Sequence, residues 1–241
     1  MKRKPNSISR SGAGFTLVEL LVVIVIIAAL AAVAFSVGPR MMKRGDAVKS
    51  VQNMRQMGST LGVYAADNSL CFPPPEAGIP DPNGGPTAKG DIWHVALLKM
   101  MYPDVQDPSK FAWDSKLWDQ TKPIFRNPLL TATSKPRFTP WTPGYGINEG
   151  INVLLFGWGE DYLSGSKTKL IPIGLIPEPS RTPIVAPAAS HRFYANTYAK
   201  VDAMKPFLVD GKFPVLFVDG HVESMPPAEY ISRKLSDMPR K

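Results

Sequence analysis

The chain has 241 residues, 44% of them hydrophobic, and carries a formal net charge of +8 at pH 7. This length accommodates a membrane segment plus one soluble domain, and the single cysteine, Cys71, excludes a disulfide within the chain. A basic charge can indicate a nucleic-acid partner. Four of the cations, however, lie in the first 14 residues, a leader that contains no acidic residue: Lys2, Arg3, Lys4 and Arg10. The rest of the chain carries +4 (+8 minus 4), so this indication is weak.

An apolar run of 23 residues from Phe15 to Val37 dominates the N-terminal region. A helix rises about 1.5 Å per residue, so this run spans a hydrocarbon core of roughly 30 Å. The run contains one charged residue, Glu19. A carboxylate in such a segment costs on the order of 2.5–3.5 kcal/mol on insertion scales, which marks Glu19 as a functional residue in need of a partner. The leader cations predict that the N-terminus is cytoplasmic and that everything after Val37 lies outside.

The heptapeptide GFTLVEL, from Gly14 to Leu20, follows the short basic leader. It closely resembles the signature of type IV prepilins and type II secretion pseudopilins. The resemblance implies that a membrane aspartic protease, the prepilin peptidase, cuts between Gly14 and Phe15 and N-methylates Phe15. It also implies that Glu19 acts in assembly. The chemistry agrees, because cleavage frees an amine on Phe15 with a reference pKa near 8, and this cation can neutralise Glu19 of a neighbouring subunit. Gly14 has no Cβ and lets a protease approach the backbone.

Two other interpretations of the N-terminus are open. The run could be a signal anchor that contains a glutamate by chance. It could also be a cleavable secretory signal, because Ala29-Leu30-Ala31 and Ala32-Val33-Ala34 fit the small-residue cleavage pattern. The position of Glu19 inside the apolar core of that signal argues against the second interpretation.

Apolar residues continue at near-helical spacing beyond Gly38-Pro39, where the missing proline donor predicts a kink. We therefore expect a helix from about Thr16 to Ala66, roughly 75 Å long at 1.5 Å per residue. Its apolar stripe would support an extracytoplasmic globular domain over residues 67–241. The stripe consists of Ala47, Val48, Val51, Met54, Leu61 and Ala65.

The segment after this helix begins with six prolines in residues 71–90, which predict a surface linker. Asp91 is the predicted N-cap of a short helix that ends at Pro103. The stretch that follows alternates aspartate with aromatic residues such as Trp113 and Trp118. These aromatics either pin a loop to the core or form a carbohydrate-binding face.

The C-terminal half is predicted to be a small β-sheet. Asp-Gly pairs at 210–211 and 219–220 predict two-residue turns with positive φ at both positions, and thus a three-stranded antiparallel meander. Pro214 cannot donate to a ladder, so the first hairpin should be short or bulged. The sequence PPAEYISRKL predicts a final short helix that starts at a proline. The expected fold class is α+β, with the long helix packed against a small antiparallel sheet as in pilins. Other β-prone runs lie at 153–157, 170–176 and 183–187.

The C-terminal phrase VLFVDGHV resembles a prepilin-like subgroup that is defined by a histidine, nine residues and Asp-Gly (H-X9-DG). The segments 144–148 and 177–183 are similar to middle signatures of that subgroup. The chain departs from the defining spacing, because 27 residues separate His191 from Asp219, and Asn127-Pro128 stands at a Cys-Pro position.

Catalytic and metal-binding patterns are not found in the sequence. His94, His191 and His221 lack zinc-site spacing, there is no nucleophile elbow or phosphate loop, and Asp202 and Asp210 lack an EF-hand pattern. We therefore expect no catalytic residue, no cofactor and no metal. Cys71 is expected to be a small buried apolar residue.

These patterns predict a structural subunit of a type II secretion pseudopilus or a type IV pilus-like filament. It would be a single-pass protein of the bacterial inner membrane that later enters a periplasmic or surface filament. The resemblance implies three partners: copies of itself and related subunits, the prepilin peptidase, and a secretion or pilus assembly platform. No nucleic acid is expected. The alternative is a membrane-anchored or secreted polysaccharide-binding module or hydrolase.

Overall fold

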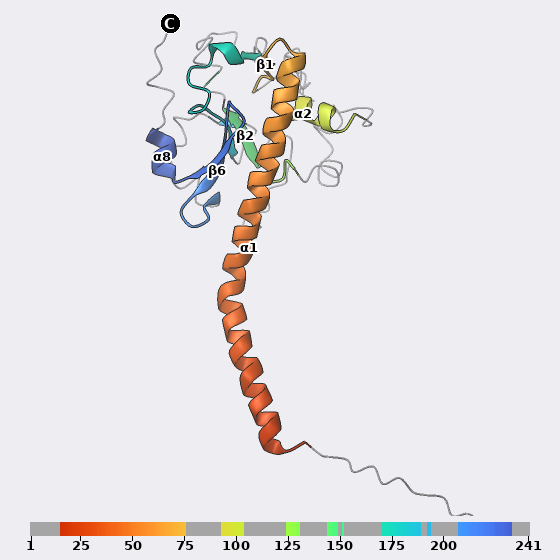
Figure 1. Ribbon diagram of the computed structural model, residues 1–241, viewed down its shortest axis with the longest axis vertical. Helices are drawn as coiled ribbons and strands as arrows, with labels where there is room; N and C mark the ends of the chain where they lie inside the picture. Colours follow the sequence, from red (N-terminus) through yellow and green to blue (C-terminus); the bar gives the residue numbers. More distant parts are fainter. Residues whose placement is uncertain are drawn as a thin grey trace, which may run out of the picture. The chain divides into compact units, whose positions relative to one another are not determined.

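The computed structural model describes residues 15–75, 93–103, 124–130, 144–148, 151, 170–188, 192–193 and 207–232. The chain divides into two compact units, Met1–Met42 and Lys43–Lys241. The fold class is α+β, as predicted, with a long N-terminal helix and antiparallel sheets (Figure 1). The elements are α1 (Leu17–Asp67), β1 (Cys71–Phe72), α2 (Trp93–Met101), β2 (Tyr145–Asn148), β3 (Ile171–Pro172), η1 (Ile173–Leu175), β4 (Pro183–Pro187), β5 (Arg192–Phe193), β6 (Phe213–Phe217), β7 (Val222–Met225) and α8 (Pro227–Ser232).

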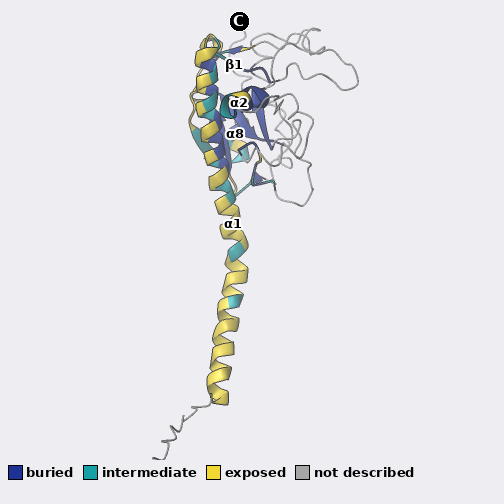
Figure 2. Ribbon diagram, turned by 90° about the vertical axis from the view of Figure 1, so that its right-hand side faces the viewer, coloured by how far each residue is buried: buried dark blue, intermediate teal, exposed yellow. Residues whose placement is uncertain are grey.

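Helix α1 has 51 residues, and its bounds agree with the predicted helix to within one residue. Pro39 lies inside it and does not end it. The boundary between the two units falls within α1, after Met42. In the first unit no residue from Phe15 to Val37 is buried, as the yellow half of the helix in Figure 2 shows.

In the second unit α1 buries one face, with neighbours three and four residues apart as a helix requires. The sequence missed Met57, which is fully buried, and wrongly included Val48, which is 60% exposed. Two polar residues share the buried face, and apolar periodicity alone cannot detect them. The buried set is Ser50, Asn53, Met54, Met57, Leu61 and Ala65.

The main sheet has five strands in the order β5-β2-β4-β6-β7. Its pairs are antiparallel, as predicted, except β2 with β5 at one edge, which is parallel. The predicted strand at 183–187 forms β4 with the same bounds. The predicted strand at 170–176 divides into β3 and the 3-10 helix η1, and β3 pairs with β1 in a separate two-stranded sheet. The predicted strand at 153–157 lies outside the described residues.

The two Asp-Gly turns differ. Asp210 and Gly211 both have positive φ, at 50° and 78°, as predicted, but they close only the single bridge between Val209 and Lys212. The first strand of the expected meander is therefore reduced to that bridge. At the second turn only Gly220 has a positive φ, at 90°. The φ expected for Asp219 was wrong, because the four residues 218–221 join β6 to β7 and only the glycine among them is in the left-handed region.

Pro214 is accommodated in β6 because of where the neighbouring strand ends. β6 pairs with β7 along Phe213 to Leu216, whereas its pairing with β4 is confined to Leu216 and Phe217. Pro214 thus lies beyond the part of β6 that has a strand on both sides. The predicted C-terminal helix is α8, which begins at Pro227 as expected.

The core joins α1 to α2 and to the sheet. Trp93, the first residue of α2, is fully buried and meets Phe125 edge to face at 5.9 Å between ring centroids. The predicted N-cap of α2, Asp91, lies outside the described residues. On α1, Gly58 permits close packing against the sheet, because a Cβ there would lie 2.8 Å from Cδ1 of Leu216.

Candidate functional site at the N-terminus

Thr16 and Glu19 form a reciprocal hydrogen-bonded pair at the start of α1. The backbone N–H and the hydroxyl of Thr16 both donate to Oε2 of Glu19, each at 2.8 Å. In return, the backbone N–H of Glu19 donates to Oγ1 of Thr16 at 3.2 Å. This is a capping box, in which the N-cap residue and the third helical residue each satisfy a backbone donor of the other.

The capping box explains why the helix begins at Leu17. The first N–H groups of a helix have no partner within it, and the positive end of the helix dipole favours a carboxylate. Glu19 meets both needs from within its own chain. The sequence-based expectation that this carboxylate finds a partner only in an assembly missed this contact. The spacing Thr-x-x-Glu before an apolar run was the signal that could have revealed it.

Phe15 precedes the cap and is 79% exposed. Its backbone is not helical, and neither is that of Thr16. Gly14, on the other side of the predicted cleavage point, lies outside the described residues. The Phe15 side of the predicted scissile bond therefore lies in non-helical chain, one residue before the N-cap.

The rest of the segment is an apolar helix with its side chains exposed. Among the described residues, α1 is the one helix that is long and apolar enough to cross a membrane, and the apolar stretch that meets this test is not buried anywhere in the protein. Exposing so many Leu, Ile and Val side chains to water is unfavourable, at about 25 cal/mol per Å². Lipid or other helices must cover them.

A known family model matches this N-terminal segment. The model described as the prokaryotic N-terminal methylation motif matches residues 9–35. This match supports a type IV prepilin-like precursor. The matched range includes Gly14, Phe15, the capping box and most of the apolar run. No curated protein and no solved structure matches the chain, and membership of the H-X9-DG subgroup remains a prediction.

A second polar contact lies where α1 packs on β2. The buried hydroxyl of Tyr145 lies 3.0 Å from Oγ of Ser50 and accepts a longer bond, 3.4 Å, from Nδ2 of Asn53. Burial raises the pKa of Tyr145 well above its usual range, and the two hydrogen bonds oppose that shift only in part. This contact, which we call the tyrosine clasp (Ser50, Asn53 and Tyr145), fixes the rotation of α1 on the sheet.

The remaining candidate residues from the sequence are distributed over the second unit. His94 is buried beside Trp93, and His221 stacks on Phe217 while its Nδ1 lies 2.5 Å from Oδ1 of Asp219. Among the described residues, no group of three or more histidine, cysteine or acidic side chains is placed to hold a metal ion. Cys71 is partly exposed rather than buried, contrary to expectation. His191, Asp202, Trp113 and Trp118 lie outside the described residues.

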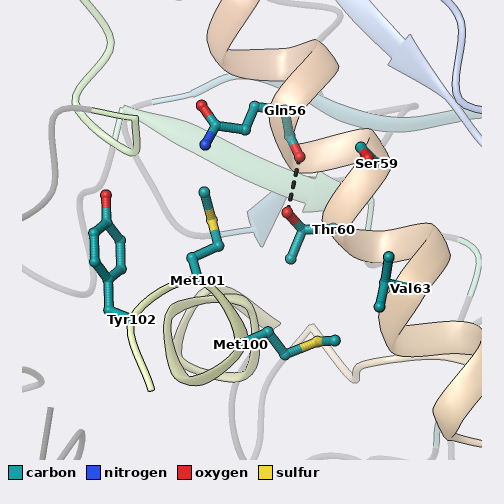
Figure 3. A pocket seen from close by; sticks show the side chains of 7 residues that line it. All are labelled: Gln56, Ser59, Thr60, Val63, Met100, Met101 and Tyr102. Carbon is teal, nitrogen blue, oxygen red and sulfur yellow. Dashed lines mark hydrogen bonds between the residues drawn. The ribbon is translucent and has the colours of Figure 1, made fainter. Parts of the chain in front are cut away.

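A groove of about 340 Å³ lies between α1 and the end of α2 (Figure 3). Its lining from α1 is mainly polar, whereas α2 and the residue after it contribute sulfur and aromatic groups. The described lining contains no carboxylate, histidine or cysteine, so it gives no specific support to the hydrolase alternative. The lining residues are Gln56, Ser59, Thr60, Val63, Met100, Met101 and Tyr102.

Proposed function

We propose that this protein is a structural subunit of a pilus-like filament, either a type II secretion pseudopilus or a type IV pilus. Prepilin peptidase removes residues 1–14 and N-methylates Phe15. Before assembly, the mature chain resides in the inner membrane with its N-terminus at the cytoplasmic side. During assembly, its helix α1 packs against the α1 helices of other subunits. Its role is mechanical rather than enzymatic.

The observation that carries this proposal is the coincidence of three features within the matched range. The methylation motif covers residues 9–35, the helix start is capped by Glu19, and the residues that follow are apolar and exposed. An exposed apolar helix beside a processing site is what a subunit needs to exchange lipid contacts for helix contacts.

The two oxygens of Glu19 allow it to serve in both the helix cap and the filament. Oε2 accepts both bonds from Thr16, while among the described residues no hydrogen bond reaches Oε1. After cleavage, the positively charged amine of Phe15 in a neighbouring subunit can approach Oε1 without breaking the cap. A charge-assisted hydrogen bond of this kind is about twice as strong as a neutral one.

The test is the intact mass of the protein purified from native membranes. A mass that matches a chain beginning at Phe15 plus one methyl group supports the proposal. A chain that begins after Ala31 or Ala34 supports simple secretion, and with it the binding-module or hydrolase alternative. A chain that keeps its leader contradicts processing altogether.

A further inference from the structure

Cations are concentrated just beyond the predicted membrane span. Within the twelve residues that follow Val37, the chain places Arg40, Lys43, Arg44 and Lys49, against Asp46 as the one acidic residue. All four cations are exposed. As orientation signals they would oppose the four leader cations, because Lys and Arg near a span favour the cytoplasmic side. A role other than orientation is therefore needed to explain them.

Within the second unit, an ion pair adds another element to this group. Nε of Arg44 lies 2.9 Å from Oδ2 of Asp210, which brings the 209–212 turn against α1. The same turn carries Lys212, which is exposed. We call Lys43, Arg44, Lys49 and Lys212 the basic edge. With Asp46 and Asp210 counted, four positive charges minus two negative charges leave this edge at +2.

Connectivity alone keeps the basic edge near the membrane. Lys43 is six positions after Val37, so it is at most about 20 Å from the end of the apolar run even if the chain is fully extended, and about 9 Å along a helix. The Debye length is about 8 Å at physiological ionic strength. The headgroup layer adds about 5–8 Å to the hydrocarbon core on each side. Because α1 continues as a helix through Lys43 and Arg44, these two cations lie within one Debye length of the lipid phosphates and experience their charge.

We propose that the basic edge binds the phosphate groups of anionic phospholipids at the outer surface of the membrane that α1 spans. The outward position of this edge rests on the function proposed above. Asp210 engages only Nε of Arg44, which leaves the terminal guanidinium nitrogens to face a phosphate, a group that arginine recognises well. Lys43 adds a point charge one residue away. The contact holds the waiting subunit at the lipid surface, and assembly must release it.

The experiment uses the full chain reconstituted in vesicles of equal parts phosphatidylglycerol and phosphatidylcholine. Spin-labelled lipids report which species occupies the layer around the protein. The wild-type chain should prefer phosphatidylglycerol, and the double variant Lys43→Gln/Arg44→Gln should lose up to about fivefold of that preference per cation. Raising the salt to 1 M, where the Debye length is about 3 Å, should reduce the wild-type preference as well.

Two matched variants separate a site from bulk charge. Arg55→Gln removes one cation from an exposed position 18 residues after Val37 and should leave the preference unchanged. Asp210→Asn keeps every cation and should keep or raise the preference. Tryptophan fluorescence, to which the buried Trp93 contributes, checks that each variant is folded.

The proposal is wrong if Lys43→Gln/Arg44→Gln keeps the full preference for phosphatidylglycerol. If the same variant also loses self-association in the vesicles, the basic edge binds a second copy of the chain instead of lipid. Failure of the proposed function is a separate result. A chain that is not cut after Gly14 would contradict the filament role and leave the lipid measurement standing.

Discussion

Glu19 caps its own helix, and the pairing with a neighbouring amine that we propose is a second role, which substitution can separate from the first. Glutamine retains the acceptor that a capping box needs but has no charge for an incoming amine. We expect Glu19→Gln to be cleaved after Gly14 like the wild type and to assemble poorly or not at all. Glu19→Ala should behave in the same way in assembly. Cleavage is followed by the mass of the membrane-bound chain, and assembly by electron microscopy of sheared filaments.

Thr16→Ala is the matched control for the charge. It removes the cap, at a typical cost of about 1 kcal/mol to the helix start, but leaves the carboxylate of Glu19 in place. Filaments should still form in this variant, more slowly than in the wild type. Normal filaments from Glu19→Gln would remove the proposed pairing role, and complete loss of filaments in Thr16→Ala would show that the cap matters more than the charge.

Tyr145 should make folding sensitive to alkaline pH. Because its pKa is raised in the folded state, it contributes stability below its unfolded pKa near 10, and this contribution is lost as the pH rises further. Above about pH 10 the free energy of unfolding should fall by up to about 1.4 kcal/mol per pH unit from this residue. Urea unfolding of the full chain in detergent micelles, followed by tryptophan fluorescence, should show a shallower fall in Tyr145→Phe.

The same substitution tests the tyrosine clasp at neutral pH. Tyr145→Phe deprives the buried hydroxyl of Ser50 of its partner in β2, so the free energy of unfolding should drop by about 1–3 kcal/mol. The double variant Ser50→Ala/Tyr145→Phe removes both polar groups and should recover part of that loss. If the double variant is no more stable than Tyr145→Phe, the hydroxyl pair does not stabilise the contact.

Among the elements, those with local signals were predicted well. The bounds of α1 follow from its apolar run and helical spacing, β4 from a short apolar run around Ile184 and Val185 that is bounded by prolines, and the Asp210-Gly211 turn from its dipeptide. Features that depend on distant residues were not predicted. Ser50 looks like a surface residue until Tyr145, 95 residues later, is placed against it. The parallel pairing of β2 with β5 likewise has no signal in either strand.

Gly144 is a further element-level constraint, and it has a close control in the chain. Its φ is +87°, and a Cβ there would lie 2.8 Å from Cβ of Asn127 and 3.0 Å from the backbone nitrogen of that residue. Gly211 has a similar φ, +78°, but nothing lies within 4 Å of its Cβ position. Backbone conformation alone costs about 1–2 kcal/mol for an L-residue at either position. Gly144→Ala should therefore lower the free energy of unfolding by more than Gly211→Ala does, and the difference should equal the cost of the clash with Asn127.

Equilibrium unfolding of the two variants under the same conditions measures this difference. Asn127 is buried and is fixed by bonds to Gly144 and Leu129, so the start of β2 cannot relax at low cost. Overpacking of this kind typically costs about 1–3 kcal/mol. An equal decrease in the free energy of unfolding in the two variants would mean that the segment around Asn127 shifts to accommodate the new methyl group.

Across the molecule as a whole, the two units are built for different surroundings. The first presents apolar side chains that are not buried anywhere in the protein, whereas the second encloses its own core around Trp93, Phe125 and Tyr145. Sequence could reveal the first unit almost completely, because a membrane span is a local property of composition and length. The roles of Phe15 in processing and of Glu19 in assembly stay predictions. The sequence did not reveal that both bonds from Thr16 go to one oxygen of Glu19, which leaves Oε1 without a hydrogen bond among the described residues.

The orientation of the span provides the last prediction. Four cations precede the span in the leader and four follow it between Arg40 and Lys49. Acidic residues contribute little to the orientation of a span. Replacing Lys2, Arg3, Lys4 and Arg10 with glutamine should therefore place part of the population with its C-terminal unit in the cytoplasm. Replacing the four downstream cations instead should leave the C-terminal unit outside in every molecule. Protease added to spheroplasts digests only chains whose C-terminal unit is outside, and equal digestion of both variants would show that the flanking charges do not set the orientation.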